Sequence, residues 1–208
     1  YEFDLLYGSR LAATSSPIKI NPSVGNPYAV TNYPPGNDIV IAFGDSLVLG
    51  TGSTSGNDFP SVLSRRLGKP VLNKGVSGDT TADTLLRIQS DVLAYNPGIV
   101  IVLLGADDAL QNVPPSVTEQ NLRTIVGLIQ SHGGIVILVG VQGGIFTDSL
   151  RDRFHAIAEN TGVAFVPNIL RGIIDNLFYL SDTLHPNDLG YAIMADRIFP
   201  ALQKLSVP

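Results

Sequence analysis

The sequence predicts a three-layer α/β/α fold, in which a doubly wound parallel sheet of five strands has helices on both faces. Short apolar runs recur along the chain, as at residues 39–43, 99–104 and 135–139. Runs without polar interruption are typical of strands that are covered on both faces, as parallel strands are. Segments with apolar residues at helical spacing separate these runs. Strands that alternate with helices in this way indicate a parallel sheet between two helical layers.

The expected elements follow from these two periodicities and from the Gly, Pro and Asp residues that bound them. The strands are expected at residues 39–43, 70–73, 99–104, 135–139 and 163–166. The helices are expected at residues 59–67, 80–96 and 116–132, around residues 150–158 and from 187 onward. Residues 169–180 are expected to form a short helix and a loop that return the chain to the edge of the sheet where the carboxyl ends of the strands lie.

Some of these boundaries carry specific expectations. Ser116 and Glu119 have the spacing of a capping box at the start of the third helix. The last helix is expected to bend or end near Pro200. The glycine-rich segment 140–144 follows the fourth strand, and we expect it to line the pocket.

Composition limits the classes of function. The chain has 208 residues, of which 44% are hydrophobic, and a net charge of −5. This is enough apolar material for one core, so we expect a single domain over residues 37–208. The absence of a Lys/Arg cluster argues against nucleic acid as a partner. The absence of cysteine excludes disulfides, thiolate metal sites and cysteine nucleophiles.

Residues 1–36 contain five prolines among serines and asparagines, which predicts an extended N-terminal arm or linker. The segment is either a disordered linker or an arm that packs on the core, and its apolar side chains favour packing. Those side chains are Ile18, Ile20, Val24 and Tyr28. The chain has no transmembrane segment, because no stretch approaches about 20 apolar residues. It begins at Tyr1, so we expect a processed or truncated form; an upstream signal or anchor could have been removed, which leaves an extracytoplasmic location open.

The first predicted strand runs directly into Gly44, Asp45 and Ser46. Ser46 therefore lies at the carboxyl end of a strand, where open parallel sheets place ligands and chemistry. A serine at this position can be a nucleophile or the N-cap of a helix. The position alone leaves both interpretations open.

Asp182 and His185 are the residues that favour a nucleophile. They lie three residues apart in a predicted loop at the same edge of the sheet. A serine hydroxyl needs a base within hydrogen-bond reach, and that base needs a third group to fix its tautomer. The other two histidines fit structural roles, His132 at a helix C-terminus and His155 as a surface or packing residue. We therefore predict a triad of Ser46, His185 and Asp182.

Four blocks in order carry a resemblance to a known family. Residues 44–47 read GDSL, 75–80 read GVSGDT, 104–108 read LGADD and 182–185 read DTLH. In these blocks, which span about residues 39–205, the chain resembles the GDSL, or SGNH, hydrolases. The resemblance implies the flavodoxin-like strand order 2-1-3-4-5. It also implies an oxyanion hole formed by the backbone N–H groups of Ser46 and Gly78 and by the side chain at Asp107, where the family pattern has asparagine.

The leading function hypothesis is a serine esterase that hydrolyses carboxylic or thio esters through an acyl-enzyme. Residues 78–80 and 58–60 look most like the thioesterase I, lysophospholipase and arylesterase branch. A carbohydrate O-acetylesterase of the same fold is the close alternative. The expected partner is a small-molecule ester, and the proposed chemistry requires no cofactor or metal. The sequence does not indicate an oligomeric state.

Two other classes are weighed against this one. Asp107 at the oxyanion position motivates a catalytically impaired binding module. A nucleotide or flavin binder would rest on fold analogy alone. Residues 50–56 are glycine-rich, but they lack the G-x-G-x-x-G spacing and are not followed by Gly-Lys-Ser/Thr. This segment is better interpreted as a flexible substrate-side loop.

Overall fold

A computed structural model describes residues 30–141 and 148–206 of the chain. Its centre is a sheet of five parallel strands in the order β2-β1-β3-β4-β5. The strands are β1 (Val40–Gly44), β2 (Val71–Gly75), β3 (Ile99–Leu103), β4 (Ile135–Val139) and β5 (Ala164–Val166). The predicted fold class and the strand order implied by the resemblance are therefore confirmed. The second strand continues two residues beyond its predicted end, to Gly75.

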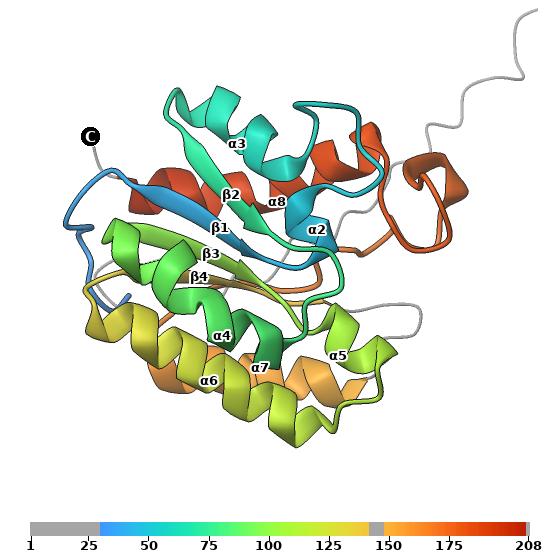
Figure 1. Ribbon diagram of the computed structural model, residues 1–208. Helices are drawn as coiled ribbons and strands as arrows, with labels where there is room; N and C mark the ends of the chain where they lie inside the picture. The colour runs from blue at the N-terminus through green and yellow to red at the C-terminus, as the bar shows by residue number, and fades with distance from the viewer. Residues whose placement is uncertain (1–29, 142–147, 207–208) are drawn as a thin grey trace, which may run out of the picture.

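Helices cover both faces of the sheet (Figure 1). One face carries α3 (Phe59–Leu67) and α8 (Asp188–Leu205), which pack against each other and against the Val40 and Ala42 side of β1. The other face carries α4 (Thr81–Asp91), α6 (Pro115–Ser131) and α7 (Asp148–Thr161). Successive strand residues point to opposite faces, so Ile41 and Phe43 lie in the second core.

Short elements occupy the two ends of the sheet. The helices α2 (Ser46–Leu49) and α5 (Ala106–Leu110) begin two and three residues after β1 and β3. The 3₁₀ helix η2 (Leu93–Tyr95) follows α4, and η3 (Leu177–Tyr179) lies in the segment between β5 and α8. All five residues of β1, β3 and β4 are buried, so the strand ends that carry α2 and α5 are anchored in the core.

The start of α6 and the end of α4 differ from the sequence-based prediction. Pro114 occupies the N-cap position of α6 without a side-chain hydrogen bond, so the predicted capping box is wrong. Pro115 starts the helix with a preset φ, which places Ser116 inside the first turn. Glu119 instead binds Arg123 and Arg153. The helix α4 ends at Asp91 rather than near residue 96, because the chain tightens into η2.

Pro200 does not end the last helix. The helix α8 continues through this exposed proline to Leu205. Proline removes one backbone hydrogen bond from a helix. On both sides of it, Ile198 and Leu202 are fully buried in the core, and this packing holds the helical path across the missing bond.

The described part of the N-terminal segment contacts the domain. Val30 is buried, and the side chain of Asn32 donates to the carbonyls of Gln130 and Gly134. Ile18, Ile20, Val24 and Tyr28 lie outside the described residues, as does the segment 142–144 that was expected to line the pocket. No helix in the described ranges is long and apolar enough to cross a bilayer.

Candidate active site

Ser46 is the first residue of the short helix α2, and the preceding residue, Asp45, caps that helix. Asp45 is the N-cap of α2, and its Oδ1 accepts a hydrogen bond of 2.9 Å from the backbone N–H of Leu47. The N-cap interpretation of Ser46 is therefore wrong, and its hydroxyl is not used to cap the helix. Ser46 is buried, with 8% exposure, and lies just beyond the carboxyl end of β1.

The loop 181–186 brings an imidazole to this hydroxyl. His185 Nε2 lies 3.0 Å from Ser46 Oγ, and His185 Nδ1 lies 2.8 Å from Asp182 Oδ2. The other carboxylate oxygen of Asp182 accepts the backbone N–H groups of Leu184 and His185, both at 2.7 Å. The structure thus places the three predicted triad residues in a continuous chain of hydrogen bonds.

These bonds also determine the charge of the carboxylate. The backbone N–H of His185, then its ring, and then the Leu184 N–H lower the pKa of Asp182 to about 2. Each bond stabilises the ionised form, because an ionised carboxylate is the better acceptor. Asp182 is therefore an anion at neutral pH and favours the tautomer of His185 that carries its proton on Nδ1.

The turn after β2 supplies the second part of the site. Gly44 pairs with Gly75 of β2 on one side and with Leu103 of β3 on the other, so the turns that follow these strands flank Ser46. Gly78 has a φ of +86°, and a Cβ at this position would meet no heavy atom within 4 Å. Glycine is therefore needed here for its backbone conformation rather than for lack of space.

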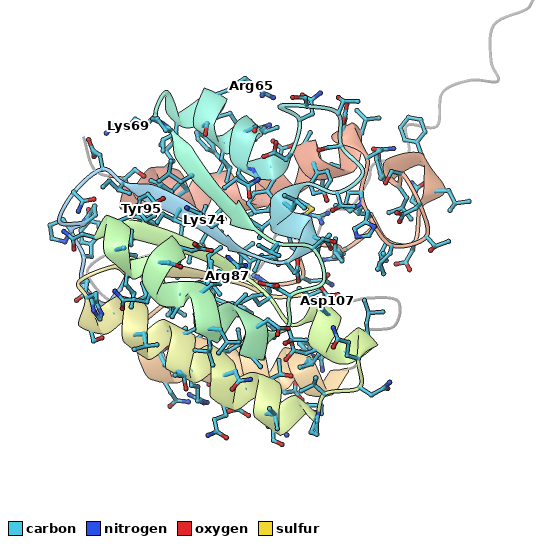
Figure 2. All side chains as sticks on the ribbon, viewed as in Figure 1. Arg65, Lys69, Lys74, Arg87, Tyr95 and Asp107 are labelled. Carbon is cyan, nitrogen blue, oxygen red and sulfur yellow. The ribbon has the colours of Figure 1, made fainter. Side chains whose placement is uncertain are left out.

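Asp107 lies in the first turn of α5, the short helix that follows β3 (Figure 2). Its side chain is half-buried and accepts no hydrogen bond from the residues the structure describes. Partial burial and, secondarily, the neighbouring Asp108 carboxylate raise the pKa of Asp107. Asp108 itself is buried and accepts hydrogen bonds from Thr81 and Thr118. The two adjacent aspartates therefore differ, because Asp108 is fully hydrogen-bonded and Asp107 is not.

Comparison with known proteins gives the family. Residues 42–193 match the GDSL-like Lipase/Acylhydrolase family. The chain belongs to this family. An arylesterase of Vibrio mimicus is 28% identical over 79% of this chain and 88% of its own length.

Solved structures agree with this assignment. The crystal structure of TesA superposes with a TM-score of 0.76 at 25% identity, over 81% of this chain and 99% of that chain. The SGNH-hydrolase family esterase AlinE4 is 31% identical, with a TM-score of 0.63, over 83% of this chain and 98% of that chain. The protein is therefore a GDSL-family hydrolase, and its relatives include proteins named as esterases.

The other aspartates in the GDSL hydrolase blocks bond to different groups. Asp45 and Asp108 accept hydrogen bonds from backbone or hydroxyl groups of the turns. Asp79 instead forms an ion pair with Arg87 of α4, at 2.6 Å. Burial raises the pKa of Asp45 to about 8, and its Oδ2 is buried without a hydrogen-bond partner among the described residues.

The sequence did not predict the contacts that residues 51–54 make with the start of α8 and with the loop that carries His185. We call these contacts the brace. Thr54 donates through its N–H and its hydroxyl to the two carboxylate oxygens of Asp188, both at 2.7 Å. Tyr191 donates to the carbonyl of Thr51 at 2.8 Å. A Cβ at Gly52 would lie 2.0 Å from the hydroxyl of Ser181. The segment that follows α2 is thus bonded to the first turn of α8, and at Gly52 it packs closely on the loop that carries His185.

Gly50 and Gly52 therefore allow close packing of this segment, whereas a Cβ at Gly56 would meet only the tip of Arg65. No sequence signal marks these contacts, because their partners are more than 100 residues apart. His132 and His155 have the structural roles expected of them. His132 accepts or donates a bond to the Leu128 carbonyl at the end of α6, and His155 packs its ring edge on Phe165. In the described ranges, no group of three or more His, Asp or Glu side chains could hold a metal ion.

Proposed function

We propose that this hydrolase is a serine esterase that cleaves carboxylic or thio esters through an acyl-enzyme on Ser46. The observation that carries the proposal is the pair of distances at His185, 3.0 Å to Ser46 Oγ and 2.8 Å to Asp182 Oδ2. A hydroxyl, an imidazole and a carboxylate in this order form the arrangement that activates serine for acyl transfer.

The reaction follows from this order. His185 Nε2 takes the hydroxyl proton as Ser46 Oγ attacks the ester carbonyl, and Asp182 stabilises the imidazolium that forms. The tetrahedral intermediate collapses when His185 returns the proton to the leaving alcohol or thiol. Water then attacks the acyl-enzyme with His185 again as base, which releases the acid and restores the Ser46 hydroxyl.

The negative oxygen of the tetrahedral intermediate needs donors that are already in place. The backbone N–H groups of Ser46 and Gly78 are candidates, since neither donates to an acceptor within the described residues. An ionised Asp107 cannot donate, whereas a protonated Asp107 can. His185 must be neutral to act as a base, so full activity needs a protonated acid and a neutral imidazole together. We therefore propose a modest rate with an optimum shifted toward acidic pH.

The substrate class is proposed from the relatives. Besides the arylesterase, they include a protein named "Thioesterase 1/protease 1/lysophospholipase L1" from Escherichia coli, which is 25% identical over 81% of this chain. We propose small aryl, alkyl or thio esters as substrates. A panel of p-nitrophenyl esters of increasing chain length, acetylated sugars and an acyl-CoA ranks these classes. Preference for the sugars would favour the O-acetylesterase alternative.

Covalent labelling tests the nucleophile. A fluorophosphonate probe should modify Ser46, with the modified peptide identified by mass spectrometry, and should not modify the Ser46→Ala variant. Ser131→Ala, which changes an exposed serine at the end of α6, serves as the matched control and should label fully. If the protein neither reacts with the probe nor hydrolyses any of the esters, it is the impaired binding module instead.

A further inference from the structure

Arg87 of α4 connects the strand that leads to Ser46 with the turn that contains Gly78. Its Nη2 donates to the carbonyl of Gly44, the last residue of β1, at 2.9 Å. Its Nη1 donates to the carbonyl of Lys74 in β2 at 3.0 Å, and its Nε donates to Asp79 Oδ2 at 2.6 Å. Arg87 lies where α4 faces the sheet (Figure 2). One guanidinium thus bonds to the backbone before the nucleophile and to both sides of the turn that contains Gly78. We call this turn the oxyanion turn.

The surroundings hold this guanidinium in one orientation. Its central carbon lies 4.6 Å from the centre of the Phe43 ring, and Phe43 is fully buried in β1. Only 17% of the Arg87 side chain is exposed. Low exposure strengthens charge-assisted hydrogen bonds, and stacking on an aromatic face fixes the plane of the guanidinium. The bonds to Gly44, Lys74 and Asp79 therefore constrain one another.

The chemistry of the side chain explains why arginine suits this position. A guanidinium presents five N–H donors in a rigid planar fork, so it can bind acceptors in different directions at the same time. A lysine ammonium is a point charge on a flexible stem and cannot reproduce this spread. The bond network needs the shape of the group as well as its charge.

We propose that Arg87 is a positioning residue for the oxyanion hole, which sets the Gly78 N–H relative to the Ser46 N–H. The inference rests on the proposed serine-esterase function. Asp79 is adjacent to Gly78, and Gly44 precedes Ser46 by two residues, so movement of either anchor changes the spacing of the two donors. These donors act on the charge that develops in the transition state, so Arg87 acts on kcat rather than on KM.

The two carboxylates bound by Arg87 provide a matched pair of variants. Asp79 belongs to the oxyanion turn, whereas Asp91 lies one turn further along α4 and bonds to the same guanidinium at 2.8 Å. Both Asp79→Asn and Asp91→Asn remove one ion pair of Arg87. The inference predicts that Asp79→Asn lowers kcat about tenfold with KM within about twofold, and that Asp91→Asn changes kcat by less than about twofold.

Arg87→Lys keeps the positive charge but removes the planar guanidinium, and Arg87→Met removes both. Both should lower kcat about ten- to a hundredfold, because misplacement of a catalytic group by about 1 Å can cost a hundredfold. Retention of wild-type kcat in Arg87→Lys would show that charge alone suffices and would overturn the positioning role. Should Arg87→Met fail to fold, the comparison of Asp79→Asn with Asp91→Asn still decides the question.

A transition-state analogue separates positioning from a general structural role. An alkyl trifluoromethyl ketone forms a tetrahedral adduct with the serine, and the oxygen of this adduct occupies the oxyanion hole. Its inhibition constant should rise in Asp79→Asn by the same factor by which kcat/KM falls, and it should not rise in Asp91→Asn. Equal effects of the two variants on kcat, or a loss of melting temperature without a change in ketone binding, would overturn the inference.

Ser46→Ala, assayed alongside, distinguishes this failure from failure of the proposed function. Full activity in Ser46→Ala would refute the serine-esterase proposal whatever Arg87 does. An inactive Ser46→Ala together with wild-type kcat in the Arg87 variants would refute the positioning role alone.

Discussion

The two halves of the candidate site are held in place by different means. Ser46 and Asp45 lie in a turn at the end of a fully buried strand, with 8% and 0% exposure. The side chain of Asp182, in contrast, is 53% exposed. Asp182 and His185 owe their positions to hydrogen bonds within a loop of a few residues. The nucleophile is placed by the core, whereas local hydrogen bonds place the exposed Asp182 and His185, whose side chain is 17% exposed.

This contrast shows where each half is vulnerable. A change at the nucleophile turn alters chemistry while the sheet keeps the backbone in place. A change at the loop can move His185 relative to Ser46, because the loop is held chiefly by its own hydrogen bonds and by its packing on Gly52. The following predictions are ordered from the largest expected effect on rate to the smallest.

Ser46→Ala should reduce ester hydrolysis by at least about 10⁴-fold while leaving the fold intact. The substitution removes one oxygen at the surface of the site and opens no cavity in the core. Steady-state assays and a melting curve measure the two effects. A large fall in melting temperature would mean that the hydroxyl supports the turn and that the contrast between the halves is mistaken.

His185→Ala should reduce kcat by about 10³- to 10⁴-fold, because the serine loses its base. His132→Ala and His155→Ala are matched controls, since these histidines contact α6 and Phe165 rather than the site. Both controls should retain nearly full kcat. Similar losses in all three variants would show that the base has been misassigned.

Asp107→Asn should raise kcat/KM at neutral pH by about tenfold or more, because an amide can donate to the oxyanion. The raised pKa of Asp107 gives the pH dependence. As pH falls, Asp107 becomes protonated and can also donate, so the advantage of asparagine should shrink toward acidic pH. The measurement is kcat/KM against pH for both proteins. If the variant is no faster at neutral pH, Asp107 is not an oxyanion-hole residue.

Gly52→Ala should lower kcat about tenfold by acting on the surface half alone. A Cβ here would lie 2.0 Å from Ser181 Oγ and 2.7 Å from the carbonyl of Pro186, so the loop that carries His185 must shift. Gly56→Ala is the control, since its Cβ would meet only the tip of Arg65, at 3.9 Å, and its φ of +80° imposes a similar backbone cost. Equal losses of kcat in both variants would assign the effect to backbone strain instead.

The sheet that carries the nucleophile turn was largely predictable from the sequence, because buried strands leave uninterrupted apolar runs. Residues 135–139 have the predicted bounds, and residues 39–43 differ from β1 by one position. Ser46, Asp182 and His185 were predicted as a triad because their residue types fit one chemistry, and the structure places His185 within hydrogen-bond distance of the other two. Motif blocks, not periodicity, implied the strand order.

The tertiary links between distant segments were not predictable. The contacts of Thr54 with Asp188, and of Arg87 with Gly44, join residues that share no spacing pattern. The predicted capping box at Ser116 is wrong for a related reason, since a local motif was interpreted without knowledge that Glu119 pairs with Arg153 of another helix. Side-chain bonds across the fold depend on geometry that one-dimensional patterns do not contain.

Asp45→Asn has the smallest expected effect on rate, but it tests the contrast between the halves through stability. Burial raises the folded-state pKa of Asp45 to about 8, whereas hydrogen bonds lower that of Asp182 to about 2. Unfolding therefore releases the Asp45 proton between about pH 4 and pH 8, and this group makes the free energy of unfolding fall as pH rises through that window. Asp182 acts in the opposite direction, because its contribution is lost as pH falls from about 4 to 2.

Asparagine at position 45 can still accept the Leu47 N–H, but it carries no charge into the core. The melting temperature of Asp45→Asn, relative to the unmodified protein, should therefore rise steadily from pH 4 to pH 8. Asp182→Asn should change the melting temperature chiefly above pH 4, and only slightly, because its side chain is largely exposed and screened by solvent. Parallel melting curves for the Asp45→Asn and unmodified proteins over this range would show that Asp45 does not titrate as a buried acid. Water would then reach the Asp45 carboxyl group, although the packing of the turn buries it.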